Sequence, residues 1–500
     1  MGILSFVTFA PLAGALAVLA VPKERVKAIR IVALSTMGVT FAMALFMLGA
    51  FEPGSPQQMD ALPMQFMERL NWVPSFNIHY AMGVDGLSFP LVLLTALMCL
   101  LAGVYALNIT LRVKEFFFWF LVLEMSMIGV FCALDMFLFY VFWEITLVPM
   151  YFLIGIWGGP KKEYAAIKFF LFTLCGSVFM LLGILALYFK SGRSFDMLEL
   201  MTKHHEWPLR FQVIVFLGFY LGLSVKIPAF PFHTWLPLAH VEAPTPVSVI
   251  LAAVLLKMGV YGILRITYSM LPAGFEWFLP IFVVIAFINI LYGALCAMAQ
   301  TDMKKMVAYS SINHMGYCML GIAAVSATGF NGAVLQMINH GLITGALFML
   351  VGVLYDRAHT RDLTAFGGLG AKVPVYAGLM TLTAMASLGL PGLAGFVSEF
   401  LCFLGAFPAW PLWTVLSVSG ILVTAAFFLR MLQKVFLGPL NEKWAELPDM
   451  NTRELLAVVP LAVLTLVLGV WPRLALDLMN PTLIYIAGLF PDMFQLVRLP

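Results

Sequence analysis

The feature that most constrains this chain is a succession of apolar runs, each long enough to cross a lipid bilayer. About 20 apolar residues span a membrane as an α-helix, and roughly fourteen runs in the sequence meet this length. Hydrophobic residues make up 62% of the 500 residues and charged residues 11%, whereas a soluble domain carries about 25% charged residues. The sequence therefore predicts an all-α integral membrane protein.

The predicted spans cover nearly the whole chain. Their approximate limits are 3–21, 28–50, 84–107, 116–133, 137–157, 167–189, 211–238, 247–270, 277–299, 306–326, 332–354, 375–409, 414–436 and 454–472. Most lysines and arginines between the spans lie in the odd-numbered loops, which predicts that these loops face the cytoplasm. Both termini are then expected on the outer, periplasmic side of the membrane, most simply a bacterial inner membrane.

The layout of the spans predicts an internal repeat. Spans four to eight start from the cytoplasm and spans nine to thirteen from the outside, and in each set the fourth helix is interrupted by proline or glycine. Inverted repeats with broken helices are typical of secondary transporters, whose ion site lies near the midplane. We expect four regions: N-terminal helices in 1–115, a first five-helix repeat in 116–270, a second in 271–437, and a last helix with a tail in 438–500.

Lys226 lies near the middle of the apolar stretch 218–249, two residues before a break. Pro228 and Pro231 each remove a backbone donor and clash with the preceding turn. Freed backbone at membrane depth is tolerated only where it is buried in protein or lines a wet cavity. A lysine at the bilayer centre costs at least ~2.5 kcal/mol, which favours a role in an ion path over a side chain that snorkels to the surface.

Two other spans carry deep charges. Glu144 is the only charge deep in span five, so it must be protonated or paired with a cation, and Lys226 is the expected partner. Lys257, Tyr261 and Arg265 recur every four residues and share one face of span eight. Lys257 sits about mid-span, whereas Arg265 lies near the outer end and is expected to snorkel.

Polar stripes mark two later spans. Ser310 and His314 lie four residues apart in span ten, and Gln336, His340 and Thr344 follow the same spacing in span eleven. A lone buried histidine is more often structural, but two on neighbouring spans with polar companions favour a hydrated path, because histidine can relay protons near neutral pH.

A second deep carboxylate follows the break in span twelve. Glu399 comes just after the segment Pro391–Gly395, and it completes a series of buried titratable side chains. In chain order this series is Glu144, Lys226, Lys257, His314, His340 and Glu399. Such an alternation suits a proton relay better than a channel or a solute carrier with shape-selective contacts. His233 and His240, which flank Pro237, are candidate entry groups.

Nothing in the sequence predicts a cofactor, metal or nucleic-acid site. The six cysteines lie in apolar segments and none forms a C-x-x-C motif, whereas zinc and iron–sulfur sites need close ligand clusters. The glycines around Gly370 lack the spacing of a phosphate-binding loop. No basic run indicates nucleic acid, and we expect lipids and other membrane subunits as partners.

Three long stretches closely resemble the antiporter-like membrane subunits of respiratory complex I. They are 141–159 (VFWEITLVPMYFLIGIWGG), 226–265 (KIPAFPFHTWLPLAHVEAPTPVSVILAAVLLKMGVYGILR) and 300–317 (QTDMKKMVAYSSINHMGY). Glu399 follows LPGLAGFVS, where the sister subunits L and N usually carry lysine. The resemblance covers nearly the whole chain.

The resemblance implies a proton-translocating subunit of NADH:quinone oxidoreductase that assembles with subunits L and N. It implies that Glu144 and Lys226 form a pair whose separation is coupled to proton movement, and that Lys257, the histidines and Glu399 continue a hydrated axis. NAD, FMN, iron–sulfur clusters and quinone would belong to other subunits, so the enzyme activity would belong to the assembly. The alternatives are a subunit of a multisubunit sodium/proton antiporter, where lysine is usual in place of Glu399, or of a membrane-bound energy-converting hydrogenase.

Overall fold

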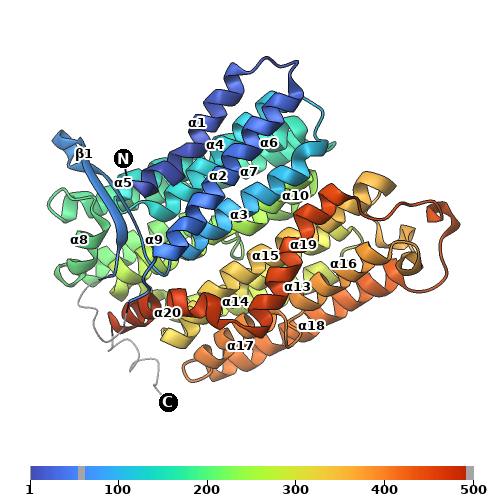
Figure 1. Ribbon diagram of the computed structural model, residues 1–500. Helices are drawn as coiled ribbons and strands as arrows, with labels where there is room; N and C mark the ends of the chain where they lie inside the picture. Colours follow the sequence, from blue (N-terminus) through green and yellow to red (C-terminus); the bar gives the residue numbers. More distant parts are fainter. Residues whose placement is uncertain (1, 55–61, 491–500) are drawn as a thin grey trace.

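The computed structural model describes residues 2–54 and 62–490, and these fold almost entirely as α-helices (Figure 1). The helices are α1 (Ile3–Ala20), α2 (Val26–Ala50), α3 (Phe89–Tyr105), α4 (Val113–Cys132), α5 (Met136–Ile145), α6 (Leu147–Trp157), α7 (Lys162–Lys190), α8 (Met197–Thr202), α9 (Leu209–Lys226), α10 (Leu236–Glu242), α11 (Thr245–Ile250), α12 (Leu256–Gly262), α13 (Pro272–Met298), α14 (Met303–Ala323), α15 (Ala327–Ala358), α16 (Pro374–Ser387), α17 (Ala394–Ala406), α18 (Pro411–Phe436), α19 (Thr452–Val470) and α20 (Arg473–Gly488). The last ten residues of the predicted tail, 491–500, lie outside the described residues.

Twelve helical segments among the described residues are long and apolar enough to cross a membrane. They correspond to twelve of the expected spans. The other two expected spans, 306–326 and 375–409, correspond to α14 and to the pair α16 and α17. The most enclosed segments are 245–268 and α15, in which the apolar windows are buried along their whole length. These two segments therefore form the centre of the molecule, where polar side chains are shielded from lipid.

Both predicted helix breaks are present. The chain leaves helical geometry between Lys226 and Leu236, where Pro228 and Pro231 lie, and again between Ser387 and Ala394, where Gly389 and Gly392 adopt positive φ angles of 80° and 92°. Such angles are free of steric cost only for glycine. Each break therefore lies where the sequence supplies residues that cannot continue a helix.

The segment 245–268 contains an irregularity that the sequence did not predict. Two π-helical turns, Leu251–Leu255 and Ile263–Tyr268, flank α12. A π-helical turn widens the helix by one residue and leaves backbone carbonyls less regularly paired. Lys257 therefore stands two residues after a stretch of irregularly paired backbone.

A β-hairpin that was not predicted projects from one end of the molecule. Strands β1 (Gln65–Val73) and β2 (Ile78–Val84) pair antiparallel, and Figure 1 shows them at the same end as the start of α1, α8 and α20. Glu68 accepts hydrogen bonds from the backbone N–H groups of Gly2 and Ser5, which fastens the hairpin to the start of α1. Burial raises the pKa of Glu68, but these bonds and one from the Ser5 hydroxyl outweigh it, so the pKa lies below its usual value.

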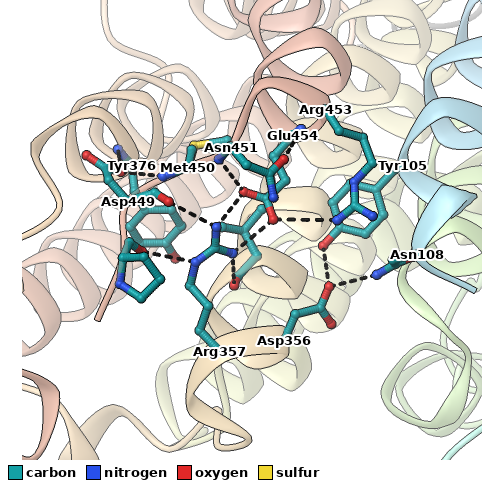
Figure 2. A network of polar contacts seen from close by, with 12 residues as sticks. Tyr105, Asn108, Asp356, Arg357, Tyr376, Asp449, Met450, Asn451, Arg453 and Glu454 are labelled. Carbon is teal, nitrogen blue, oxygen red and sulfur yellow. Dashed lines mark hydrogen bonds and ion pairs between the residues drawn. The ribbon is translucent and has the colours of Figure 1, made fainter. Parts of the chain in front are cut away.

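A network of polar contacts joins the C-terminal end of α15 to the N-terminal ends of α16 and α19 (Figure 2). Arg357, near the end of α15, forms a bidentate contact with Glu454 on α19, with distances of 2.9 and 2.7 Å. It also donates to the carbonyl oxygens of Val353, Pro448 and Asp449. The Asp449 carboxylate in turn accepts from two N–H groups in the first turn of α16. This cluster, which we call the Arg357 clasp, ties α15, α16 and α19 to the loop before α19.

Candidate functional site

Glu144 lies just before a one-residue interruption of span five, at Thr146, that the sequence did not predict; the backbone angles of Thr146 remain helical. Helix α5 ends at Ile145 and α6 begins at Leu147, with Thr146 between them, and Pro149 brings no backbone donor to the first turn of α6. Asp135 caps α5 by accepting bonds from the N–H groups of its first turn. The side chain of Glu144 is only partly buried, and its Oε1 atom has no hydrogen-bond partner.

Lys226 is the last residue of α9 and is 1% exposed. Its ammonium donates to the Thr146 hydroxyl at 3.2 Å and lies over the rings of Trp143 and Phe169, 5.3 and 5.8 Å from their centroids. Glu144 is near enough for its charge to act on the ammonium. The two side chains, however, do not form the direct ion pair that the sequence analysis expected. The Thr146 hydroxyl and the rings of Trp143 and Phe169 contact the ammonium instead.

The break after Lys226 is held by a residue that the sequence analysis missed. The Asn289 side chain, on α13, accepts a bond from the N–H of Phe230 at 2.7 Å and donates to the Pro228 carbonyl at 3.3 Å. These are backbone groups that an unbroken helix would have satisfied itself. The only signal in the sequence was a single asparagine in an otherwise apolar span.

Lys257 is fully buried and belongs to a second cluster of polar side chains, separate from that of Glu144 and Lys226. Its ammonium donates to the carbonyl oxygen of Ala252 at 2.5 Å and lies 2.6 Å from Nδ1 of His340. The two helices that carry these side chains are the most enclosed of the molecule. Lys257 and His340, 83 positions apart in the sequence, are thus in direct contact.

The same cluster continues from His340 to Glu399. The rings of His340 and His314 lie 5.3 Å apart, and Nδ1 of His314 is 3.4 Å from Oε1 of Glu399. Nε2 of His314 also contacts the Ser387 hydroxyl at 3.1 Å, at the end of α16. The sequence did not single out this serine.

A small cavity lies inside this cluster. Its volume is about 10 Å³, and its lining includes His314, Gln336, His340, Thr344 and Glu399. A cavity of this size holds about one water molecule when several polar groups surround it. The polar stripes predicted on α14 and α15 therefore do face each other, together with the carboxylate of α17.

His240 is a buried histidine on α10, near the end of the molecule that is expected to face the cytoplasm. Its ring is fully buried, stacks on Phe348 at 4.5 Å and has no hydrogen-bond partner at either nitrogen. The charges of Lys304 and Lys257 both act on it. A polar cavity of about 290 Å³ opens beside it and is lined by Glu242 and Lys304, among others. His233 is buried as well, in the break itself.

The six candidate side chains thus fall into two groups. Glu144 and Lys226 form the first, and the second joins the remaining four in the order Lys257, His340, His314, Glu399. Within the described part of the chain, no hydrogen bond links Lys226 to Lys257. The geometry therefore gives two clusters of titratable side chains, and in the second cluster each side chain lies next to the following one.

Two charged positions differ from expectation or were overlooked. Arg265 does not snorkel: it is 1% exposed and forms a buried ion pair with Asp85 at 2.6 Å, so that prediction is wrong. Asp85 reaches Arg265 because the segment between β2 and α3, in which Asp85 lies, is itself buried. Glu124 on α4 is fully buried and was not considered, because it lacks the regular spacing that revealed the other groups.

No group of three or more possible metal ligands occurs in the described residues, and the cysteines there form no disulfide. Buried ammonium, imidazole and carboxyl groups beside broken helices are typical of ion-translocating membrane proteins.

Comparisons with known proteins define the family. A model of the family "NADH:quinone oxidoreductase/Mrp antiporter, TM" matches residues 133–424. NADH-quinone oxidoreductase subunit M of Rhodobacter capsulatus is 44% identical over 501 residues, covering 97% of this chain and 96% of the relative. NAD(P)H-quinone oxidoreductase chain 4 of a Synechococcus strain (JA-3-3Ab) is also 44% identical, over 85% of this chain and 82% of its own length.

Solved structures agree. A chain of respiratory complex I from Thermus thermophilus superimposes with a TM-score of 0.87 at 30% identity, covering 97% of this chain and 99% of that one. A chain of the Mrp complex from Dietzia has a TM-score of 0.83 at 20% identity and shows the shared fold. The chain belongs to the NADH:quinone oxidoreductase/Mrp antiporter family, and within it to the proteins called subunit M or chain 4. The predicted all-α membrane fold and the predicted family are confirmed, whereas the repeats and the number of spans remain predictions.

Proposed function

We propose that this chain is a proton-translocating subunit in the membrane arm of an NADH:quinone oxidoreductase, where it couples electron transfer in other subunits to proton movement. The observation that carries this proposal is the continuous buried series from Lys257 to Glu399. Each of its four members can gain or lose a proton, and consecutive members lie close together. Lys257 contacts His340, the ring centroids of His340 and His314 are 5.3 Å apart, and His314 lies 3.4 Å from Glu399. Groups of this kind inside a membrane mark proton relays.

The first cluster supplies a switch. Glu144 attracts the ammonium of Lys226 without contacting it, so a small displacement of the α5–α6 junction changes the interaction strongly in a region of low dielectric. The prolines after Lys226 interrupt α9 beside the ammonium and give the segment freedom to move. In this scheme a change at Glu144 releases the proton of Lys226 towards the second cluster.

The remaining details belong to the same proposal. NAD, FMN, iron–sulfur clusters and quinone are bound by partner subunits, among them neighbours of the L and N type, and this chain carries no redox centre. The membrane is a bacterial inner membrane, with both termini on the outer side. The four regions 1–115, 116–270, 271–437 and 438–500 correspond to the N-terminal helices, two inverted repeats and the C-terminal helix with its tail.

The test uses the assembled enzyme in membrane vesicles. Glu144→Ala and Lys226→Ala should each reduce quinone-linked NADH oxidation about tenfold or more, although neither residue touches a redox centre, because electron and proton transfer are tightly coupled. Glu163→Ala, which removes an exposed carboxylate from the first turn of α7, is the matched control and should behave as wild type. Near wild-type turnover of an assembled Glu144→Ala enzyme would contradict the proposal.

Purification separates this function from the alternative of a sodium/proton antiporter subunit. The chain should co-purify with flavin and iron–sulfur centres in constant proportion. A stable assembly that lacks both centres and exchanges sodium for protons would favour the antiporter.

A further inference from the structure

The ammonium of Lys226 is buried without an anion in contact. Its side chain is 1% exposed, and among the described residues its one hydrogen-bond acceptor is the neutral hydroxyl of Thr146, at 3.2 Å. An ammonium carries three N–H donors, so two of them have no such acceptor here. A buried charge is costly unless its surroundings replace the lost water, and the other contacts of the ammonium must therefore compensate for this cost.

Two aromatic rings supply the compensation. The ammonium lies over the ring of Trp143 on α5 and over that of Phe169 on α7, 5.3 and 5.8 Å from their centroids. A cation within about 6 Å of a ring is attracted by the negative face of its π-system, and the attraction grows when both groups are removed from water. Trp143 is 1% exposed and Phe169 is fully buried. The two rings therefore stabilise the charged ammonium and not the neutral amine.

The third contact, the Thr146 hydroxyl, is oriented to accept. It donates its own proton to the carbonyl oxygen of Trp143 at 2.7 Å, which leaves the lone pairs of the hydroxyl for the ammonium. Its side chain is fully buried. The hydroxyl is thus a fixed acceptor beside the two rings.

The ring of Phe169 is braced against the backbone that carries Lys226. Trp235 packs on this ring, with centroids 5.3 Å apart and an interplanar angle of 61°, and its Nε1 donates to the carbonyl oxygen of Val225 at 2.9 Å. Val225 directly precedes Lys226 in α9. The ring and the backbone of the lysine are therefore joined through one residue.

We propose that Trp143, Thr146 and Phe169 form an ammonium-binding site, which we call the aromatic site, that holds the charged side chain of Lys226 apart from Glu144. Glu144 directly follows Trp143 in α5, so the carboxylate and the indole leave the helix in different directions, and Oε1 of Glu144 has no hydrogen-bond partner. The ammonium contacts the indole and the hydroxyl instead of this carboxylate.

The three side chains are positioning residues of the proposed relay, and this role rests on the proposed function. The attraction of the rings depends on positive charge, so the aromatic site retains Lys226 while it is protonated and loses its hold when the proton leaves.

The binding of the ammonium is tested without any assumption about pumping. Phe169 is replaced site-specifically by phenylalanines with one, two or three fluorine atoms, which withdraw electrons from the face of the ring with little change of size. We expect the unfolding temperature of the assembly in detergent to fall stepwise with the number of fluorine atoms, because each one weakens the attraction for the cation. The fall should be absent in Lys226→Met, whose side chain carries no charge.

The matched control position is Phe219, a fully buried residue of α9 that packs against Gly183 of α7. The same fluorine series at Phe219 should give no stepwise fall. Equal unfolding temperatures across the Phe169 series, or the same fall in Lys226→Met, would overturn the proposal.

The role in the relay is measured by quinone-linked NADH oxidation of the assembled enzyme. The fluorine series at Phe169 should lower the rate stepwise, to about a tenth with three fluorine atoms. Trp143→Leu should lose about as much, whereas Trp143→Phe restores a ring and should recover most of the rate.

Two outcomes overturn this second step. They are an unchanged rate across the Phe169 series and equal rates of assembled Trp143→Leu and Trp143→Phe. If the wild-type assembly moves no protons at all, the proposed function fails, while the unfolding temperatures still decide whether the rings bind the ammonium of Lys226.

Discussion

Lys226 and Lys257 are both buried ammonium groups, but their surroundings differ. Lys226 faces a hydroxyl, two aromatic rings and a carboxylate at longer range, whereas Lys257 contacts a carbonyl and a histidine. A carboxylate acts only on Lys226, whereas a histidine acts on Lys257. In the proposed relay Lys226 therefore serves as the switch, and Lys257 receives the proton and passes it on.

Lys226→Arg separates charge from proton transfer. Arginine does not deprotonate in proteins, so the variant keeps the attraction to Glu144 but cannot release a proton. We expect an assembled enzyme that has lost most proton pumping, about tenfold or more, measured in vesicles with a pH-sensitive dye. If the variant pumps as well as wild type, Lys226 is an electrostatic partner only.

Glu399 is expected to act as the protonatable end of the second cluster. Glutamine keeps the size of the side chain but binds no proton, whereas aspartate still can, at a longer distance from His314. Glu399→Gln should therefore lower the ratio of protons pumped to electrons transferred more than Glu399→Asp does. Equal ratios in the two variants would remove Glu399 from the path.

At the scale of helices, the break between α16 and α17 depends on close backbone packing. A Cβ atom added at Gly395 would meet the carbonyl oxygen of Ala386 at 2.1 Å, whereas one added at Gly378 on α16 would meet nothing within 4 Å. Gly395 thus lets α17 start directly against the end of α16. This contact fixes the distance between Ser387 and Glu399, which both reach His314.

Gly395→Ala should push α17 away and weaken the contact between His314 and Glu399. We expect proton pumping to fall about tenfold, because small displacements in a relay are costly. Gly378→Ala is the matched control and should be neutral or slightly stabilising, since alanine favours helix by up to about 1 kcal/mol over glycine. Equal pumping by the two variants would show that the relay tolerates a shift of α17.

The sequence predicted the elements better than their contacts. Apolar length and proline or glycine placement located the spans and two breaks, because both signals are local. The contact of Lys257 with His340, the ion pair of Asp85 with Arg265 and the role of Asn289 depend on which helices pack together. Helix packing is determined by many weak contacts between distant parts of the chain, and no single residue predicts it. The hairpin was missed because a short two-stranded element leaves little periodicity in a polar loop.

At the scale of the whole molecule, the Arg357 clasp joins helices distant in the sequence. All three guanidinium nitrogens of Arg357 make hydrogen bonds, and Glu454 is 2% exposed at its side chain. Because Asp449 in the same loop caps α16, the clasp connects α15, which carries His340, to the helix that ends at Ser387. The clasp thus joins α15 and α16, the helices that carry His340 and Ser387 of the second cluster, at a point away from that cluster.

Arg357→Ala should leave the buried Glu454 with only its longer pair to Arg453, at 3.7 Å, and destabilise the protein by about 2 kcal/mol through the lost charged hydrogen bonds. The expected result is a clearly lower unfolding temperature of the assembly in detergent. Arg473→Ala removes an exposed pair with Asp477, 3.9 Å long, and should cost less than about 0.5 kcal/mol. Similar unfolding temperatures for both variants would show that the clasp contributes little.

The π-helical turn before Lys257 has a mechanical consequence. The carbonyl that holds the ammonium, that of Ala252, belongs to the turn itself, so the charge on the side chain and the winding of the backbone share one hydrogen bond. A neutral amine donates more weakly, so in the proposed relay the departure of the proton would weaken this bond. The winding of the turn would then respond to the protonation of Lys257.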